Sequence, residues 1–272
     1  MPVSRAQEQL FLFSQLFGGG DFLNMPYAYR LNGPLDVAAL ERSIGEIVRR
    51  HEVLRSCFRE EPRGPVQSVR RRVRIHLPLI DLSTLPEKQR QIKLEDISRK
   101  DADRSFDVEE APLFRTKLLR LADDEHVLLI TFHHLICDQW STAVFRRELA
   151  ALYRAFSKGM PSPLKDLPVQ FTDWVRWQRE ILKNDFLDRQ IEYWRNQLSG
   201  PSAPLNLHGG KKAAKSVHYR SARHPIEIGR VLLARIKSLA HEYNCTPFMI
   251  LIAALNLLLH RRTGQTDIRI AT

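Results

Sequence analysis

The feature that most constrains the fold is a nearly all-apolar run in the middle of the chain, His126–Phe132 (HVLLITF). A half-buried strand alternates apolar and polar residues, so an unbroken apolar run of this length predicts a strand buried on both faces. The run Leu113–Leu121 (LFRTKLLRL) precedes it, and Asp123-Asp124-Glu125 joins the two. Two such runs joined by a short polar turn predict an antiparallel hairpin.

Helices and short strands are predicted on both sides of this hairpin in the sequence. Ser4 followed three residues later by Gln7 is a capping-box pattern that opens a first helix, which Gly18-Gly19-Gly20 ends. Asp36 caps a second helix, whose apolar residues fall at helical spacing. Further helices are predicted over Pro86–Arg104, after HHLICDQWS to about Lys158, and over Phe171–Glu180 and Phe186–Leu198, with short strands over Asn24–Arg30, Ser56–Arg59 and Val66–His76.

The last quarter of the chain differs in composition. Residues Ser199–Ser216 (SGPSAPLNLHGGKKAAKS) are rich in Gly, Pro, Ala and Lys and predict a surface linker. A strand (Val217–Ile228), two helices (Arg230–Tyr243, Thr246–His260) and a strand (Asp267–Ala271) are predicted beyond it. We therefore divide the chain into a lobe (1–198), a linker (199–216) and the beginning of a second lobe (217–272). Fifty-six residues after the linker are too few for a lobe of equal size, so we expect an unfinished chain.

Charge and cysteine content limit the classes of protein. The chain carries 42 Lys and Arg against 31 Asp and Glu, a net charge of +11, with the excess concentrated after residue 200. A basic end and the run Arg70–Arg74 (RRRVR) are compatible with nucleic acid or with an acidic protein partner. No helix-turn-helix, zinc-finger or RNP pattern accompanies them, and in a strand those arginines would alternate faces on a solvated edge. We therefore expect no nucleic-acid partner.

Targeting signals are lacking in the sequence. The longest apolar run, Phe248–Leu259, is 12 residues long, well short of the roughly 20 that span a bilayer. The first residues lack a signal-peptide layout, and three scattered cysteines argue against a disulfide framework. We expect a soluble, cytoplasmic protein without a membrane partner.

The densest chemical signal is the segment His133–Ser141 (HHLICDQWS), where the buried strand passes into a loop before a helix. Successive strand side chains face opposite ways, so one of His133 and His134 should line a site while the other anchors the strand end. Asp138 can fold back to meet a histidine or an arginine. A neutral imidazole can accept a proton from an attacking amine, hydroxyl or thiol. Two satisfied core histidines are an equally good interpretation of the pair alone.

Other chemistries have weaker support. No Glu or His cluster at ligand spacing accompanies the histidine pair, so no metal site is expected. Cys137 suggests a thiol nucleophile, but a small buried residue is the better interpretation. No GxSxG, P-loop or GxGxxG pattern occurs, which leaves hydrolase and nucleotide-binding functions without support.

The segment HHLICDQWS resembles the HHxxxDG motif of the condensation domains of nonribosomal peptide synthetases, and its HxxxD core resembles the wider chloramphenicol-acetyltransferase-like superfamily. Four further segments resemble family motifs in the same order, over essentially the whole chain. They are Ser4–Leu10 (SRAQEQL, like SxAQxxL), Arg50–Phe58 (RHEVLRSCF, like RHExLRTxF), Phe171–Trp177 (FTDWVRW, like YxDYAxW) and Gly264–Ile270 (GQTDIRI).

The resemblance implies a fold of two α/β sandwich lobes, with the second lobe only partly present, and an active site at their junction. It implies an acyltransferase that joins a carrier-bound acyl or peptidyl thioester to a carrier-bound aminoacyl acceptor through an amide. No cofactor is bound directly, because the substrates arrive on phosphopantetheine arms. The expected partners are donor and acceptor peptidyl carrier proteins and a neighbouring adenylation domain, and the chain alone should show little turnover.

The resemblance also assigns residues to roles. His134 matches the histidine that positions or deprotonates the acceptor amine, and His133 and Asp138 match its supporting members. Arg55 and Arg50 match arginines that support the site, and we expect an Asp138–Arg55 ion pair. The tunnel residues would be Gln139, Trp140 and Ser141.

The sequence departs from the family pattern at Gln139, which replaces the motif glycine; we expect the loop to tolerate it. The intact HHxxxD argues against a heterocyclisation domain, and the order Trp140-Ser141 argues mildly against an epimerisation domain. Two alternatives stay open. One is a stand-alone acyltransferase that uses acyl-carrier or acyl-coenzyme A donors. The other is a non-catalytic carrier-docking remnant.

Overall fold

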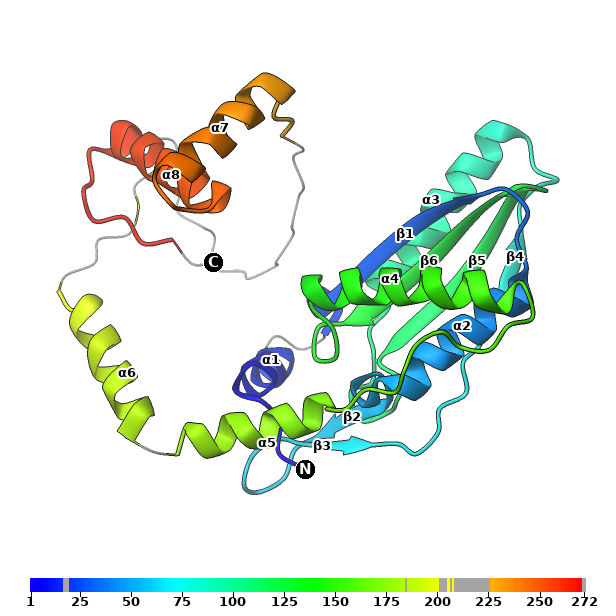
Figure 1. Ribbon diagram of the computed structural model, residues 1–272, viewed down its shortest axis with the longest axis horizontal. Coiled ribbons are helices and arrows are strands. Elements are labelled where there is room, and N and C mark those ends of the chain that lie inside the picture. The colour runs from blue at the N-terminus through cyan, green and yellow to red at the C-terminus, as the bar shows by residue number, and fades with distance from the viewer. Residues whose placement is uncertain (17–19, 184, 201–204, 206, 208–225, 271–272) are drawn as a thin grey trace. The chain divides into compact units, whose positions relative to one another are not determined.

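The computed structural model describes residues 1–16, 20–183, 185–200, 205, 207 and 226–270. The chain forms two compact units, Met1–Gln190 and Ile191–Thr272, which are described separately (Figure 1). The predicted linker (199–216) and the predicted strand Val217–Ile228 lie largely outside the described residues, as do residues 17–19 at the predicted end of the first helix.

The first unit is built on a four-stranded sheet in the order β1-β6-β5-β4, with β6 (Glu125–His133) inside it. Strands β1 (Asn24–Asn32) and β5 (Phe114–Ala122) flank β6, and both pair with it antiparallel. Strand β4 (Leu79–Asp81) pairs parallel with β5. The predicted hairpin is therefore confirmed. Every residue of β6 after Glu125 is buried, as the apolar run predicts.

Two apolar clusters cover the two faces of the sheet. Leu128, Ile130 and Phe132 of β6 belong to the larger one, whose other residues come partly from α2 (Val37–Arg50) and α4 (Gln139–Phe156). The alternate residues Val127 and Leu129 belong to the smaller cluster, together with Leu94 of α3 (Glu87–Asp103). In Figure 1, α2 and α4 lie against one face and α3 against the other. Strand alternation thus places β6 between two helical layers.

Further elements lie outside this sheet and the helices that cover it. They are α1 (Arg5–Leu16), the 3-10 helices η1 (Gly20–Leu23) and η2 (Glu52–Arg55), the antiparallel pair β2 (Ser56–Arg59) and β3 (Val66–Val69), α5 (Phe171–Ile181) and α6 (Asp185–Gln197). The boundary between the two units falls within α6. The predicted capping box is confirmed: Ser4 Oγ accepts from the Gln7 N–H, and Gln7 Oε1 accepts from the Ser4 N–H.

One strand prediction of the first unit was wrong in its end, and one strand was missed. The strand predicted over Val66–His76 ends at Val69, because its partner β2 offers only four residues for pairing. The run Arg70–Arg74 is therefore not an edge strand. Strand β4 was not predicted, since three residues carry too little periodicity to be recognised.

The second unit contains α7 (Arg230–Glu242) and α8 (Pro247–Thr263), which confirms the two predicted helices. Thr246 caps α8 by accepting from the Met249 N–H, and Gly264 at φ 72° ends it. Residues 267–270 form no strand, contrary to prediction, because the described part of this unit holds no strand to pair with. None of the helices described is, taken singly, both long and apolar enough for a membrane span; α7 and α8 pass that test only as a pair, bent by 103°.

A buried carboxylate fastens α3 to the sheet. Asp101, 3% exposed, forms ion pairs with Lys117 and Arg115 of β5 and accepts a hydrogen bond of 2.7 Å from Thr131 Oγ1 of β6. Burial acts to raise the pKa of Asp101, but the contacts from Lys117, Thr131 and Arg115 outweigh it and hold the pKa below its ordinary value. The carboxylate is therefore charged at neutral pH.

We predict that Asp101→Ala destabilises the protein by about 3 kcal/mol at neutral pH, because two cations lose their buried partner. A carboxyl whose pKa is lowered on folding contributes stability above its ordinary pKa, and this contribution disappears as the pH falls through the lowered value. The difference between wild type and variant should therefore shrink in acid. Urea unfolding at neutral and at acidic pH measures it.

The control is Asp96→Ala on the same helix, since Asp96 also pairs with cations, Arg99 and Lys100, but at the surface. This variant should unfold at nearly the same urea concentration as the wild type. Equal destabilisation by the two variants would show that the buried cluster does not fasten α3.

Candidate functional site

The histidine pair stands at the end of β6, where its N–H groups donate hydrogen bonds to two other segments and fix the backbone. The His133 N–H donates to the Leu113 carbonyl and the His134 N–H to the Leu23 carbonyl, each at 2.9 Å. Residues 134–138 then form a tight loop that leads into α4. The strand ends here because its two neighbours no longer run alongside it.

His133 points into the interior. It is 0% exposed, and its ring packs edge-on against Phe106 with centroids 6.0 Å apart. Nδ1 accepts from the Leu135 N–H at 3.2 Å, so Nε2 carries the proton of the neutral ring. Burial, as the main cause, and the neighbouring His134, as a smaller one, lower the pKa of His133 to about 4. His133 is therefore uncharged at neutral pH and anchors the strand end.

His134 lines a cavity of about 330 Å³, here called the His134 cavity. Its walls come from α1 (Gln7, Leu10), from the loop and start of α4 (His134, Asp138, Ser141) and from α5 (Phe171, Trp174). His134 Nδ1 is buried and has no hydrogen-bond partner among the described residues. Strand alternation separates the two histidines, one toward the core and the other toward the cavity.

Helix α1 supports this loop through a contact that the sequence did not suggest. Buried Gln7, besides forming the capping box, donates from Nε2 to the Leu135 carbonyl at 2.9 Å. The segments Ser4–Leu10 and Phe171–Trp177 thus contribute to the same cavity as HHLICDQWS. No sequence signal could have paired Gln7 with Leu135, because they are 128 positions apart.

Asp138 is the N-cap of α4. Its Oδ1 accepts from the Ser141 N–H at 2.7 Å and from the Ser141 hydroxyl at 2.6 Å. Partial burial acts to raise the pKa of Asp138. The hydrogen bonds from Ser141 and the nearby His134 lower it and outweigh burial, so the pKa lies below its ordinary value. The Asp138 carboxylate caps the first turn of α4 and forms no hydrogen bond with either histidine.

The expected Asp138–Arg55 ion pair was wrong. The Arg55 guanidinium donates instead to four backbone carbonyls, those of Val48, Arg49, Arg70 and Arg71. Carbonyl oxygens at the end of α2 and after β3 need donors, and a planar guanidinium with five N–H groups satisfies several at once. Arg55 therefore joins two backbone segments and is not among the residues that line the His134 cavity.

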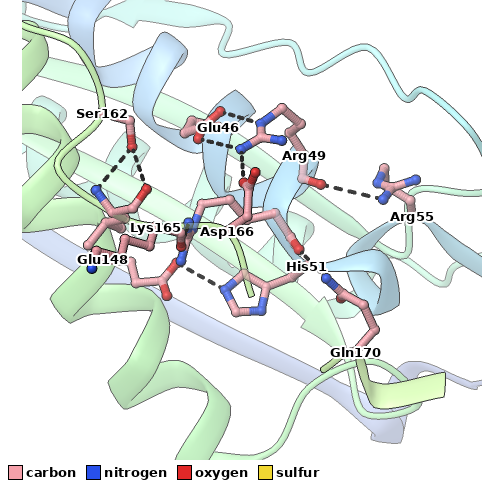
Figure 2. Close-up of polar contacts among 11 residues, drawn as sticks. Glu46, Arg49, His51, Arg55, Glu148, Ser162, Lys165, Asp166 and Gln170 are labelled. Atoms are coloured by element: carbon pink, nitrogen blue, oxygen red, sulfur yellow. Dashed lines mark hydrogen bonds and ion pairs between the residues drawn. The ribbon is translucent and has the colours of Figure 1, made fainter. Parts of the chain in front are cut away.

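Arg50 lies in a buried charged cluster between α2 and α4. Arg50 Nε and His51 Nε2 lie 3.3 Å and 2.9 Å from the same oxygen of Glu148, with the Arg50 and Glu148 side chains 3% and 9% exposed. Figure 2 shows His51 and Glu148 facing each other across the helices. Burial acts to raise the pKa of Glu148, but His51 and Arg50 outweigh it and lower the pKa below its ordinary value. Glu148 was not singled out in the sequence, where it stands in an ordinary amphipathic helix.

A second, smaller cavity adjoins the first, with which it shares several lining residues. It measures about 210 Å³ and is mostly apolar, with Phe132, Phe145, Trp140 and His51 in its wall, and it shares Val53, Ile136, Cys137, Ser141 and Phe171 with the His134 cavity. Cys137 is buried. Its burial and the nearby negative charge of Asp138 raise the pKa of its thiol to about 12. A thiol held protonated is no nucleophile at neutral pH, which argues for the structural interpretation.

The three expected tunnel residues lie in different surroundings. Ser141 lines both cavities, and Trp140 lines the smaller one although it is 80% exposed. Gln139 lines neither and accepts a hydrogen bond from the Tyr27 hydroxyl at 3.3 Å. Within the described ranges, no three His, Cys, Asp or Glu side chains are grouped as metal ligands.

Comparison with known proteins places this geometry in a family. A model of the condensation domain matches residues 1–272. Chondramide synthase cmdD of Chondromyces crocatus is 39% identical over 272 residues, and malpinin synthetase of Mortierella alpina is 36% identical over 272 residues. Each match covers 100% of the chain but only 7% of the first protein and 4% of the second.

Solved structures agree on the fold. The first condensation domain of the CDA synthetase superposes with a TM-score of 0.78 at 22% identity, covering 98% of this chain and 63% of that one. The SgcC5 protein of Streptomyces globisporus gives 0.74 at 28% identity, covering 98% and 61%. These likenesses confirm the expected α/β fold. Because the family model matches the chain from end to end, the chain belongs to the condensation-domain family of nonribosomal peptide synthesis.

Proposed function

We propose that this domain forms an amide bond between a donor acyl or peptidyl thioester and an aminoacyl acceptor, with His134 at the reacting amine. The observation that carries the proposal is the contrast between the two histidines. His133 is fully enclosed and neutral and lines no described cavity, whereas His134 lines the His134 cavity. A free imidazole nitrogen beside a cavity can accept a hydrogen bond from an amine.

The reaction balances without a cofactor. The amine nitrogen attacks the thioester carbonyl, a C–N bond forms, and the C–S bond breaks. The amine proton passes to His134 or to solvent, and the departing sulfur takes up a proton to leave as a thiol. Much of the acceleration would come from holding the two reactants together, because an unprotonated amine is already a nucleophile.

The neighbouring residues would act through the backbone. Asp138 would set the start of α4, and with it Ser141 at the boundary of the two cavities. His133 would fix the end of β6, while Arg50 and Arg55 would hold α2 against α4 and against the segment after β3. Gln139, Trp140 and Ser141 would border the route by which substrates enter. We count only His134 as a catalytic residue.

The substrates would arrive on the phosphopantetheine arms of a donor and an acceptor carrier protein, with an adenylation domain as a neighbour. This follows from family membership and from relatives that are peptide synthetases, including malpinin synthetase. The same reasoning supports a cytoplasmic location and a catalytic centre to which no cofactor binds directly.

The first test of the proposed function separates the catalytic histidine from its neighbours. In the full-length protein, His134→Ala should lower amide formation at least about 100-fold, since that is the lower bound for a lost general base. Product is measured by mass spectrometry under single-turnover conditions, and the melting temperature should stay near that of the wild type. The control His241→Ala removes an exposed histidine of α7 and should change neither. Full amide formation by His134→Ala would contradict the catalytic role.

A second prediction tests whether Asp138 acts as a cap. Asp138→Ala should destabilise the protein by about 1 kcal/mol, the usual cost of a lost N-cap, and should lower amide formation as the loop shifts. Asp138→Asn keeps a good capping side chain and should restore stability and most of the activity. Thermal unfolding and product formation are measured on both variants. An inactive Asp138→Asn with normal stability would instead place the Asp138 charge in the chemistry.

A third experiment distinguishes carrier-dependent synthesis from a stand-alone acyltransferase. The full-length protein is supplied with one acyl group, either on a carrier protein or on coenzyme A, in the presence of an aminoacyl-carrier acceptor. We expect amide product with the carrier donor and at least about tenfold less with coenzyme A, because carrier contacts add binding energy. Equal rates would favour the stand-alone acyltransferase.

A further inference from the structure

An exposed basic segment follows β3. Four of the five residues in Arg70–Arg74 are arginine, and no Asp or Glu occurs from Pro62 to Ile80. All four arginines are exposed. None of their side chains forms an ion pair or hydrogen bond with any residue in the described part of the chain. Solvated arginines are common, but four neighbouring ones without an acidic partner are a concentrated positive charge.

The backbone of this segment is held in place. Val73 and Ile75 are half-buried and pack against the main apolar cluster, while Arg74 between them and Arg70–Arg72 before them are exposed. The Arg55 guanidinium binds the carbonyls of Arg70 at 2.5 Å and of Arg71 at 3.3 Å. The arginines therefore project from a fixed backbone, and a partner would not have to order it on binding.

We propose that the segment Arg70–Arg74 is a docking site for an acidic face of a carrier protein, an inference that rests on the proposed function. Arg55, which fixes the segment, ends η2, and Val53 of the same 3-10 helix lines both cavities. Charge on this segment thus adjoins the element that borders the reaction site. We take a carrier protein as the occupant because the proposed function supplies one, and because residues 62–80 contain no Phe, Tyr or Trp on which the bases of a single strand could stack.

The expected effect is on encounter and not on chemistry. Clustered exposed charges raise association rates by roughly 10- to 1,000-fold and lose this effect as salt screens them. Removing the arginines should therefore raise KM for a carrier-bound substrate while leaving kcat unchanged. A small thioester without a carrier makes no contact with the segment, and its KM should not change.

The test uses the full-length protein with the variant R70Q/R71Q/R72Q/R74Q. We expect KM for carrier-bound substrate to rise at least about tenfold at low ionic strength, with the difference shrinking as salt is added. KM for the same acyl group on free pantetheine should stay the same. The matched control K88Q/R147Q/K158Q/K165Q removes four exposed cations from other surfaces and should leave both KM values unchanged. A carrier KM that is equal in the two variants would overturn the proposal.

A crosslinking experiment makes the docking proposal testable even if no amide is formed. A benzophenone amino acid replaces exposed His76, just outside the arginines, and crosslinked peptides are identified by mass spectrometry. Adducts with an acidic segment of a carrier domain, lost in the arginine variant, would support docking. Adducts with nucleic acid, or carrier adducts that persist in the variant, would overturn it. Carrier adducts without any amide product would leave docking supported while the proposed function fails.

Discussion

The burial of β6 on both faces is the constraint on which the rest of the first unit depends. The strand is enclosed by β1 and β5 at its edges and by apolar clusters on both faces, so the position of its end is fixed by packing on every side. Its strict alternation then decides that His133 belongs to the interior and His134 to the cavity. The separation of the two histidines is therefore a property of the sheet and needs no contact between them.

Polar contacts at the ends of elements complete the site. The helix α4 starts where it does because Asp138 caps it, and the loop before it is fixed because Gln7 of α1 holds the Leu135 carbonyl. The Glu148 cluster fixes α4 again further along the helix, by pairing with Arg50 and His51 at the end of α2. Each of these contacts joins segments far apart in the chain or begins a helix, and together they leave His134 on a rigid edge.

The charged residues of the unit divide into two kinds with different physical roles. Asp101 and Glu148 are buried and stay ionised because charged and hydrogen-bonding groups surround them, Lys117 and Arg115 around Asp101, and Arg50 and the His51 ring around Glu148. The arginines at 70–74 are exposed and uncompensated among the described residues, and their backbone is fixed by another arginine. Buried pairs fix the fold, while exposed charge in a fixed arrangement is available to a partner.

Local sequence patterns determined much of this protein. Helical spacing and capping residues predicted the places of the helices, and the apolar run predicted the buried hairpin, because both depend on neighbours within a few positions. The motifs also indicated the family and directed attention to His134. The predicted ion pair between Asp138 and Arg55 was wrong, since Arg55 binds backbone carbonyls, and no pattern suggested Gln7 or Glu148 as supports. Those contacts join residues far apart in the chain, and only the packed tertiary structure decides which donor reaches which acceptor.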